Sequence, residues 1–129
     1  MRPYEIIKKE GDSGTLSVID NLSGLFGEAK RIFWVQCKHP CTRGKHAHFR
    51  TRQLLIPVKG QFRIRLDDGT RVETKFIDEE DNMGVMLHPL VWHEIELHSD
   101  DGIFLVLADT EYQESDYIRC YESFLQLVA

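Results

Sequence analysis

The sequence has few cysteines, no long apolar run and no excess of positive charge, and each shortage excludes a class of protein. Its three cysteines are an odd number, so we expect no disulfide framework and favour a reducing compartment. The longest apolar run, 103–108, is far shorter than the ~20 residues of a membrane-spanning helix. The N-terminal residues contain no apolar stretch typical of a secretory signal. We therefore expect a cytoplasmic protein.

The charge balance limits the partners that the chain can bind. With a net charge of −5, it has no overall electrostatic reason to bind nucleic acid or an anionic membrane. A local basic pocket for one small anion is compatible with this balance. The length of 129 residues fits one domain, 1–129, and a hydrophobic content of 42% excludes a disordered chain.

Short strands separated by turns account for most of the chain. In 61–66, Phe62, Ile64 and Leu66 alternate with polar residues, which is the period of a half-buried strand. The sequence DDG at 67–69 predicts a turn, because glycine tolerates a positive φ. Further strands are expected at 31–35, 54–58, 72–76, 85–87, 92–97 and 103–108. Strands of this length and spacing indicate a sandwich or barrel.

The C-terminal segment has a different period. From Tyr117 to Val128, apolar residues recur at intervals of three and four, which predicts an amphipathic helix. Ser115 is the expected N-cap, and Asp116 is expected to stabilise the first turn through its charge.

Two histidines in the sequence RGKHAH at 43–48 are the strongest functional signal. In a strand, His46 and His48 point to the same face, where paired imidazoles can bind a metal or transfer protons. Gln53 and Gly60 follow, and PLVWH ends at His93. The pattern HxHx4[EQ]x6G, followed by PxxxH, resembles the two motifs of the cupin superfamily. This resemblance implies an all-β jelly-roll barrel whose mouth holds the site, here with a short C-terminal helix.

The same four positions bear on metal binding. In metal-binding cupins, the positions that match His46, His48, Gln53 and His93 carry three histidines and a glutamate. A neutral amide is a poorer ligand for a divalent cation than a carboxylate, so we expect neither a metal nor another cofactor. A metal-dependent cupin that uses these four residues is an alternative.

A longer set of motifs is more specific. RGxHAH, QLLIPVKG at 53–60, LDDG at 66–69, PxxWHE at 89–94 and DYIRxYxxF at 116–124 together resemble the nucleotide-sugar 3,4-ketoisomerases of the WxcM-like cupins. Those enzymes act on dTDP-4-keto-6-deoxyglucose. The resemblance implies a metal-free homodimer that serves deoxysugar biosynthesis, for O-antigen and other surface polysaccharides or for glycosylated natural products. It places the catalytic pair on His46 and His48 and the motif arginine on Arg43. We expect His46 to be the base, since the ordinary pKa of histidine lies near working pH.

Two positions depart from the family. The strand that usually reads RVYY reads RIFW here, so Phe33 stands where the family has a tyrosine thought to transfer protons. The opening DxRGxL lacks its arginine at 12–16. Without the tyrosine, His48 or a water would have to move the second proton, and C3 epimerisation of the same sugar becomes an alternative to ketoisomerisation. A sugar-nucleotide-binding cupin without catalysis is a further alternative.

Substrate binding is expected to use cationic and aromatic side chains. Arginine binds pyrophosphate with bidentate geometry, and Arg43 and Arg63 are the preferred candidates, with Lys45 adding charge. The remaining expected substrate contacts are Phe33, Gln53, Trp92 and His93. Nothing in the sequence distinguishes a dTDP-, CDP- or GDP-linked sugar.

Overall fold

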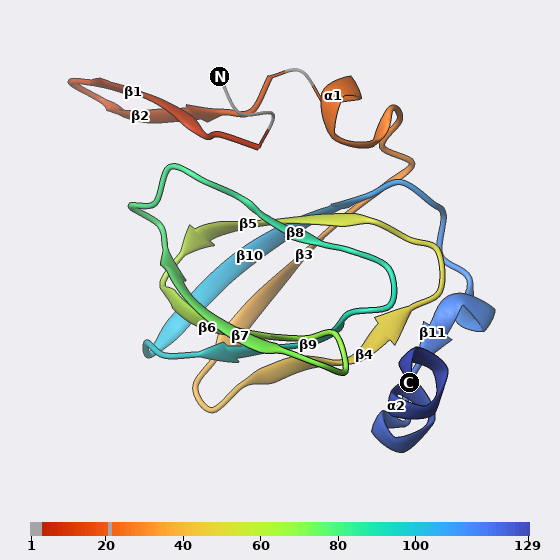
Figure 1. Ribbon diagram of the computed structural model, residues 1–129. Helices are drawn as coiled ribbons and strands as arrows, with labels where there is room; N and C mark the ends of the chain where they lie inside the picture. The colour runs from red at the N-terminus through yellow and green to blue at the C-terminus, as the bar shows by residue number, and fades with distance from the viewer. Residues whose placement is uncertain (1–3, 21) are drawn as a thin grey trace.

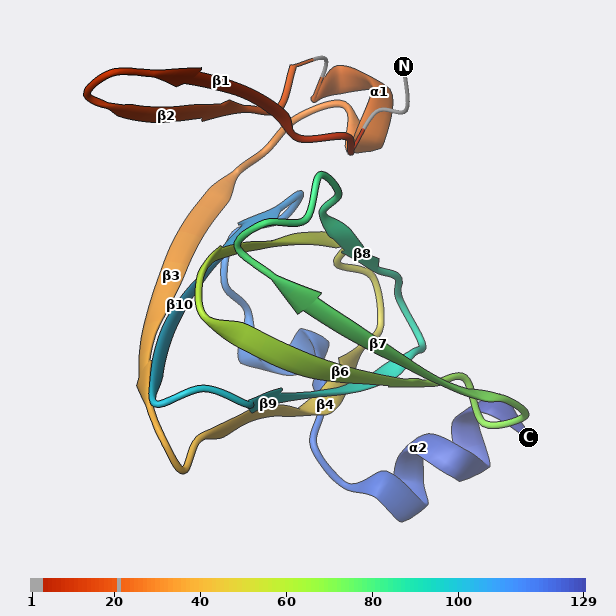
Figure 2. The ribbon, with the colours of Figure 1, turned by 90° about the vertical axis from the view of Figure 1, so that its left-hand side faces the viewer.

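Two antiparallel sheets form the body of the protein in a computed structural model that describes residues 4–20 and 22–129 (Figure 1). The first sheet has the order β3 (Arg31–Lys38), β10 (Asp101–Ala108), β5 (Gln53–Lys59) and β8 (Val85–Leu87). The second has the order β11 (Tyr117–Ile118), β4 (Thr42–His48), β9 (Trp92–Leu97), β6 (Gln61–Asp67) and β7 (Val72–Asp78). The sheets face each other and curve around a common interior (Figure 2).

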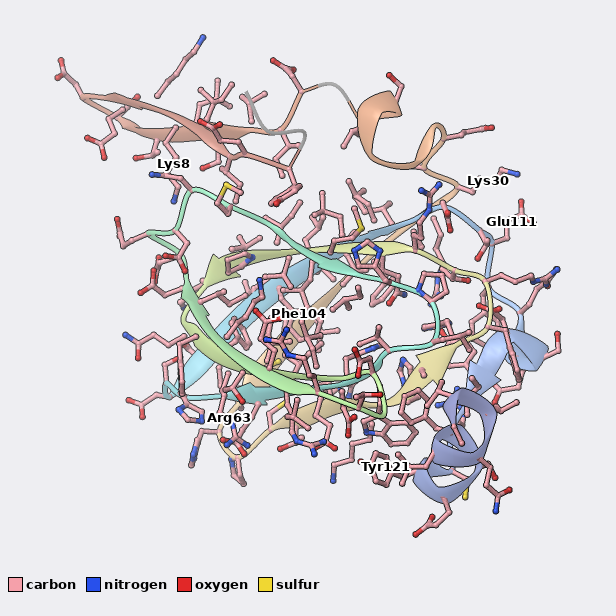
Figure 3. The ribbon with its side chains drawn as sticks, in the orientation of Figure 1. Lys8, Lys30, Arg63, Phe104, Glu111 and Tyr121 are labelled. Carbon is pink, nitrogen blue, oxygen red and sulfur yellow. The ribbon has the colours of Figure 1, made fainter. Side chains whose placement is uncertain are left out.

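The core lies between these sheets and follows the strand alternation. Phe104 and Val106 of β10 are buried against Phe62 and Ile64 of β6. The rings of Phe62 and Phe104 meet edge to face, with centroids 5.5 Å apart. Figure 3 shows Phe104 between the sheets. Each such side chain contributes roughly 1.5–3 kcal/mol by leaving water.

The predicted all-β barrel with a short C-terminal helix is confirmed, and each expected strand is present. The sequence did not predict the first hairpin, β1 (Ile7–Gly11) and β2 (Gly14–Val18), which stands apart from the barrel (Figure 2). A short helix, α1 (Ser23–Phe26), lies between this hairpin and β3. Most hairpin residues are exposed, so they lack the apolar face that predicts a strand.

The prediction for the start of the C-terminal helix was wrong. Ser115 lies in a 3-10 turn, η1 (Glu114–Asp116), and α2 (Tyr121–Val128) begins later, with Cys120 at its N-cap. The intervening Tyr117 and Ile118 pair with β4 instead, because the barrel edge offers backbone partners that outweigh local helix preference.

Helix α2 covers the outer face of the second sheet beside β4 and β9. Phe124 is fully buried there with Ala47, Trp92 and Ile118. In the part of the chain that the structure describes, no helix has the length and apolarity needed to cross a membrane.

Candidate active site

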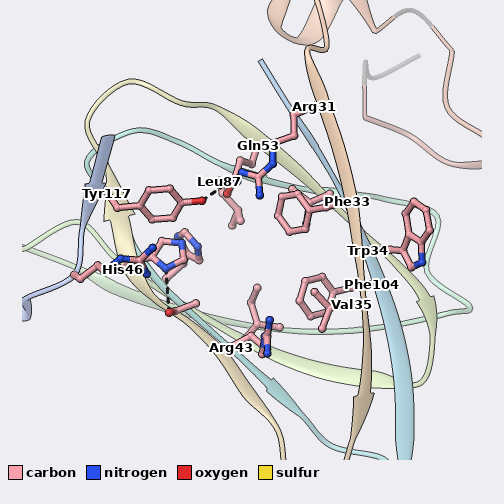
Figure 4. Close-up of a pocket in the computed structure, with 15 residues that line it drawn as sticks. Arg31, Phe33, Trp34, Val35, Arg43, His46, Gln53, Leu87, Phe104 and Tyr117 are labelled. Atoms are coloured by element: carbon pink, nitrogen blue, oxygen red, sulfur yellow. Dashed lines mark hydrogen bonds between the residues drawn. The ribbon is translucent and has the colours of Figure 1, made fainter. Parts of the chain in front are cut away.

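A cavity of about 330 Å³ opens between the sheets (Figure 4). Its polar wall contains three arginines, two histidines, a glutamine and a tyrosine, namely Arg31, Arg43, Arg119, His46, His93, Gln53 and Tyr117. The other lining residues are Gly44 and seven apolar residues, namely Phe33, Trp34, Val35, Leu87, Ile95, Phe104 and Val106. A small cavity with apolar walls and a few convergent polar groups is typical of a binding site for a small organic molecule.

A bulge in β4 brings the histidines together. Gly44 and Lys45 have positive φ values of 84° and 60°, and the strand register shifts between Gly44 and His46. As a result His46 lies directly opposite His93 of β9, with ring centroids 4.6 Å apart. A Cβ on Gly44 would come within 2.9 Å of the carbonyl oxygen of His93, so this position requires glycine.

His48 lies behind His46 and is held by a carboxylate. Its Nδ1 is 3.1 Å from Oδ2 of Asp116, and both side chains are buried. Because a carboxylate accepts, Nδ1 carries the proton and Nε2 carries the free lone pair. That Nε2 is buried and has no hydrogen-bond partner among the described residues. Such an unpartnered nitrogen costs about 1–3 kcal/mol, which indicates a functional role.

Asp116 is fixed by neighbours on the loop after β4. Its Oδ1 accepts from the backbone N–H of Arg50 at 2.9 Å, and its Oδ2 accepts from the backbone N–H and hydroxyl of Thr51. Burial raises the pKa of Asp116, but these hydrogen bonds outweigh it and hold the pKa below its ordinary value. The carboxylate is therefore ionised at neutral pH and stabilises a positive charge on His48.

All three histidines have lowered pKa values. Burial, together with the smaller effect of nearby histidines, lowers the pKa of His46 to about 4 and that of His93 to about 3. Burial also lowers the pKa of His48, although Asp116 opposes this change. At neutral pH all three imidazoles are therefore neutral and able to accept a proton or a metal ion.

The neutral imidazoles fit the donor chemistry of a transition metal. Ligating nitrogens of His46, His48 and His93 lie within 4.8 Å of one another. In His46 the Nδ1–H donates to the carbonyl of Gly44 at 3.0 Å, which leaves Nε2 as the possible ligand atom. Two imidazole nitrogens bound to one zinc ion at ~2.0–2.1 Å lie within about 4 Å of each other. The histidine rings would therefore move slightly closer together to bind a metal. A metal at this place would act as a Lewis acid on a substrate oxygen.

Tyr117 joins the histidines to the opposite sheet. Its ring centroid is 4.4 Å from that of His48 and 4.9 Å from that of His46. Its hydroxyl accepts from Nη1 of Arg31 at 3.3 Å (Figure 4). Arg31 lies 4.5 Å above the ring of Phe33, and Arg119 lies 4.3 Å above the ring of Tyr117.

The structure brings most of the sequence-predicted site residues together. His46, Arg43, Gln53, His93 and Phe33 line the cavity, and His48 lies immediately behind His46, with ring centroids 5.0 Å apart. The expectation that His46 and His48 share one face is therefore confirmed.

Three predicted substrate-binding residues lie elsewhere. Side chains alternate along β9, so His93 faces the barrel interior while Trp92 faces outward and packs against Tyr121 and Phe124 of α2. The same alternation places Arg63 on the outer face of β6, where it pairs with Glu96 at 3.4 Å (Figure 3).

Lys45 is the extra residue of the β4 bulge and is exposed. Among the described residues, Trp92, Arg63 and Lys45 are absent from the cavity lining.

The sequence interpretation did not recognise Asp116, Tyr117, Arg119 and Arg31 as site residues. The first three belong to the DYIR motif at 116–119, which was a usable signal. Tyr117 was counted in the apolar stripe of a helix and Asp116 in its first turn, whereas the structure turns both toward the histidines, beside the pairing of β11 with β4.

Comparisons with known proteins identify relatives of this chain. The sequence profile of the FdtA family, described as WxcM-like, C-terminal, matches residues 1–129. A TDP-4-oxo-6-deoxy-alpha-D-glucose-3,4-oxoisomerase of Aneurinibacillus thermoaerophilus is 36% identical over 95% of this chain and 88% of its own.

Solved structures show the same fold. A 3,4-ketoisomerase of Helicobacter canadensis superposes with a TM-score of 0.87 at 32% identity, covering 97% of this chain and 94% of its own. The sugar 3,4-ketoisomerase QdtA of Thermoanaerobacterium thermosaccharolyticum, solved in complex with TDP, also superposes with a TM-score of 0.87, at 27% identity and with coverages of 97% and 91%. The family match over the whole chain and these relatives lead to one conclusion: the protein belongs to the FdtA family of WxcM-like sugar ketoisomerases.

Proposed function

We propose that the protein is a 3,4-ketoisomerase of a TDP-linked 4-keto-6-deoxyhexose, serving deoxysugar biosynthesis. The observation that carries this proposal is the buried pair of His48 and Asp116, which lies directly behind His46 in the wall of a cavity of about 330 Å³. Support comes from the 36% identical relative, whose name specifies this reaction, and from QdtA, which was solved with TDP.

Arg43 is the proposed ligand of the pyrophosphate. Its side chain points into the cavity (Figure 4), and it forms no ion pair among the described residues. Arg119, in contrast, pairs with Glu114 at 2.7 Å, and Arg31 donates to Tyr117. A free guanidinium binds an anion without first breaking an internal contact, and its fork matches two phosphate oxygens.

His48 is the proposed base at C3. The C4 ketone acidifies the hydrogen on C3, and its removal gives an enediolate. His48 is a stronger base than His46, because Asp116 stabilises its imidazolium while the Nδ1–H of His46 meets only the neutral carbonyl of Gly44. These contacts support His48 for the role that the sequence assigned to His46.

His46 completes the acid–base pair at the cavity surface. With a pKa of about 4, it stays neutral at pH 7, and its Nε2 accepts a hydrogen bond from a sugar hydroxyl. Reprotonation of the enediolate at C4 by the His48 imidazolium then gives the 3-keto sugar.

C3 epimerisation is the second candidate reaction, and Phe33 is the observation that favours it. Phe33 lines the cavity but cannot carry a proton. From the same enediolate, reprotonation at C3 on the opposite face would invert C3 without any proton transfer between oxygens. The product therefore separates the two reactions.

We also propose that the protein forms a homodimer in the cytoplasm. On the outer face of the first sheet, Ile32 and Trp34 of the edge strand β3 are 54% and 61% exposed. An apolar patch on an edge strand favours pairing of two copies through this face, giving a homodimer.

The free thiols of Cys37, Cys41 and Cys120 are compatible with the cytoplasm. Surface polysaccharide such as O-antigen is the proposed destination of the sugar.

The test is incubation with TDP-4-keto-6-deoxyglucose in D2O, followed by proton NMR of the sugar. Deuterium on carbon together with a 3-keto product supports ketoisomerisation, whereas a C3-inverted 4-keto sugar supports epimerisation. TDP binding without exchange would show a binding protein and contradict the proposal.

The metal-dependent alternative has its own test. One tightly bound metal ion per chain, lost in H93A together with the activity, would overturn the metal-independent reaction proposed here.

A further inference from the structure

Ketoisomerisation needs two separate proton transfers. One proton moves from C3 to C4, and a second moves from the C3 hydroxyl to the C4 oxygen. His48 serves the carbon atoms, so a second group must serve the oxygens. Phe33, on the wall formed by β3, supplies no exchangeable proton.

Tyr117 places a hydroxyl in the same cavity from the other sheet. Figure 4 shows its hydroxyl pointing across the cavity toward Arg31, with Phe33 on the facing wall. Its ring contacts both catalytic imidazoles, with centroids 4.4 Å from His48 and 4.9 Å from His46. The Tyr117 hydroxyl and the His46 imidazole therefore share the cavity that the sugar would enter.

Arg31 sets the direction and charge of this hydroxyl. Its Nη1 donates to the Tyr117 oxygen at 3.3 Å, so the phenolic hydrogen is free to point to a different acceptor in the cavity. The guanidinium also stabilises the phenolate that forms when the hydroxyl gives up its proton.

We infer that Tyr117 is the catalytic acid–base group that moves the proton between the two sugar oxygens, in place of a tyrosine at position 33. This inference rests on the proposed ketoisomerase function. As His48 takes the proton from C3, Tyr117 gives its proton to the C4 oxygen. The phenolate then takes the proton of the C3 hydroxyl, while the His48 imidazolium protonates C4. C3 is oxidised and C4 reduced within one molecule, so no external oxidant or reductant takes part.

The experiment is Y117F assayed in D2O for two quantities, deuterium exchange at C3 and formation of the 3-keto product. We expect product formation to fall by on the order of 100-fold or more, the usual contribution of a general acid–base group. Exchange at C3 should fall much less than product formation, because His48 and Asp116 still remove the C3 proton, whereas the product needs Tyr117 in both proton transfers between the oxygens. A general structural fault would instead reduce both quantities together.

The control is Y4F, which removes a phenol outside the cavity lining and should change neither quantity. Product formation by Y117F at the wild-type rate, or equal loss of exchange and product, overturns the role of Tyr117. Absence of both exchange and product in the wild type overturns the proposed function instead.

If Y117F does not fold, difluorotyrosine at position 117 keeps the ring and hydroxyl but makes the phenol more acidic. The pH dependence of product formation, and not that of C3 exchange, should then move to lower pH. An unchanged profile overturns the inference.

Discussion

Nδ1 of His48 lies 3.1 Å from Oδ2 of Asp116, and both groups are buried within a protein whose net charge is −5. The contact fixes the tautomer of His48 and leaves its Nε2 as a base. It also joins β4 to the segment that precedes β11, residues far apart in the sequence. The acid–base chemistry therefore depends on how the C-terminal segment docks on the barrel.

Substitution of Asp116 should weaken the base without removing it. In D116N the amide cannot stabilise an imidazolium, so we expect C3 exchange and turnover to fall by on the order of 100-fold. The matched control is D109N, because Asp109 also accepts from a backbone N–H and a guanidinium, both of Arg52. Equal losses in the two variants would show that Asp116 acts only on stability.

The lowered histidine pKa values should make the fold sensitive to acid. In the unfolded chain the histidines take up protons near pH 6.5, whereas folded His46 and His93 resist protonation down to about 4 and about 3. Their contribution to stability is therefore complete above pH 6.5 and is lost as the pH falls toward 3.

Denaturant unfolding at a series of pH values measures this effect. H93N should flatten the dependence of the unfolding free energy on pH, whereas H88N, at an exposed histidine, should leave it unchanged. If the unfolding free energy of H93N depended on pH as steeply as that of the wild type, His93 would not be a source of the acid sensitivity.

Affinity for TDP should depend on Arg43 and not on Arg63. Removal of a charge-assisted contact costs about 1.5–3 kcal/mol, so R43Q should raise the Kd by roughly 10–100-fold in calorimetry. R63Q removes only the surface pair with Glu96, worth about 0–1 kcal/mol of stability, and should bind TDP like the wild type. A larger effect of R63Q would place the nucleotide on the outer sheet face instead.

The assembly should respond to charge on the outer face of β3. Light scattering is expected to give twice the chain mass of 15.1 kDa for the wild type and the chain mass for W34E. F76E is the control, because Phe76 is 70% exposed but lies on β7 of the other sheet. A monomeric wild type, or dissociation in F76E and not in W34E, would exclude the proposed interface.

The sequence alone determined the fold class and half of the site. Alternation at 61–66 predicted β6 with its buried face, because the two-residue period of a strand is a local property. The spacing of His46 and His48 predicted their common face for the same reason. The family motifs added His93 and Gln53, which the barrel brings to the same cavity.

Tertiary structure decided the rest. Trp92 and His93 are neighbours in sequence, yet only the position of α2 shows that the outer face of β9 is covered and that Trp92 belongs to that core. Asp116 and Tyr117 fit a helix by their spacing, but pairing with β4 gives them backbone partners and turns them toward His48. The local sequence pattern determines on which face of a strand a side chain lies. Packing between segments distant in sequence determines which residues contact that face.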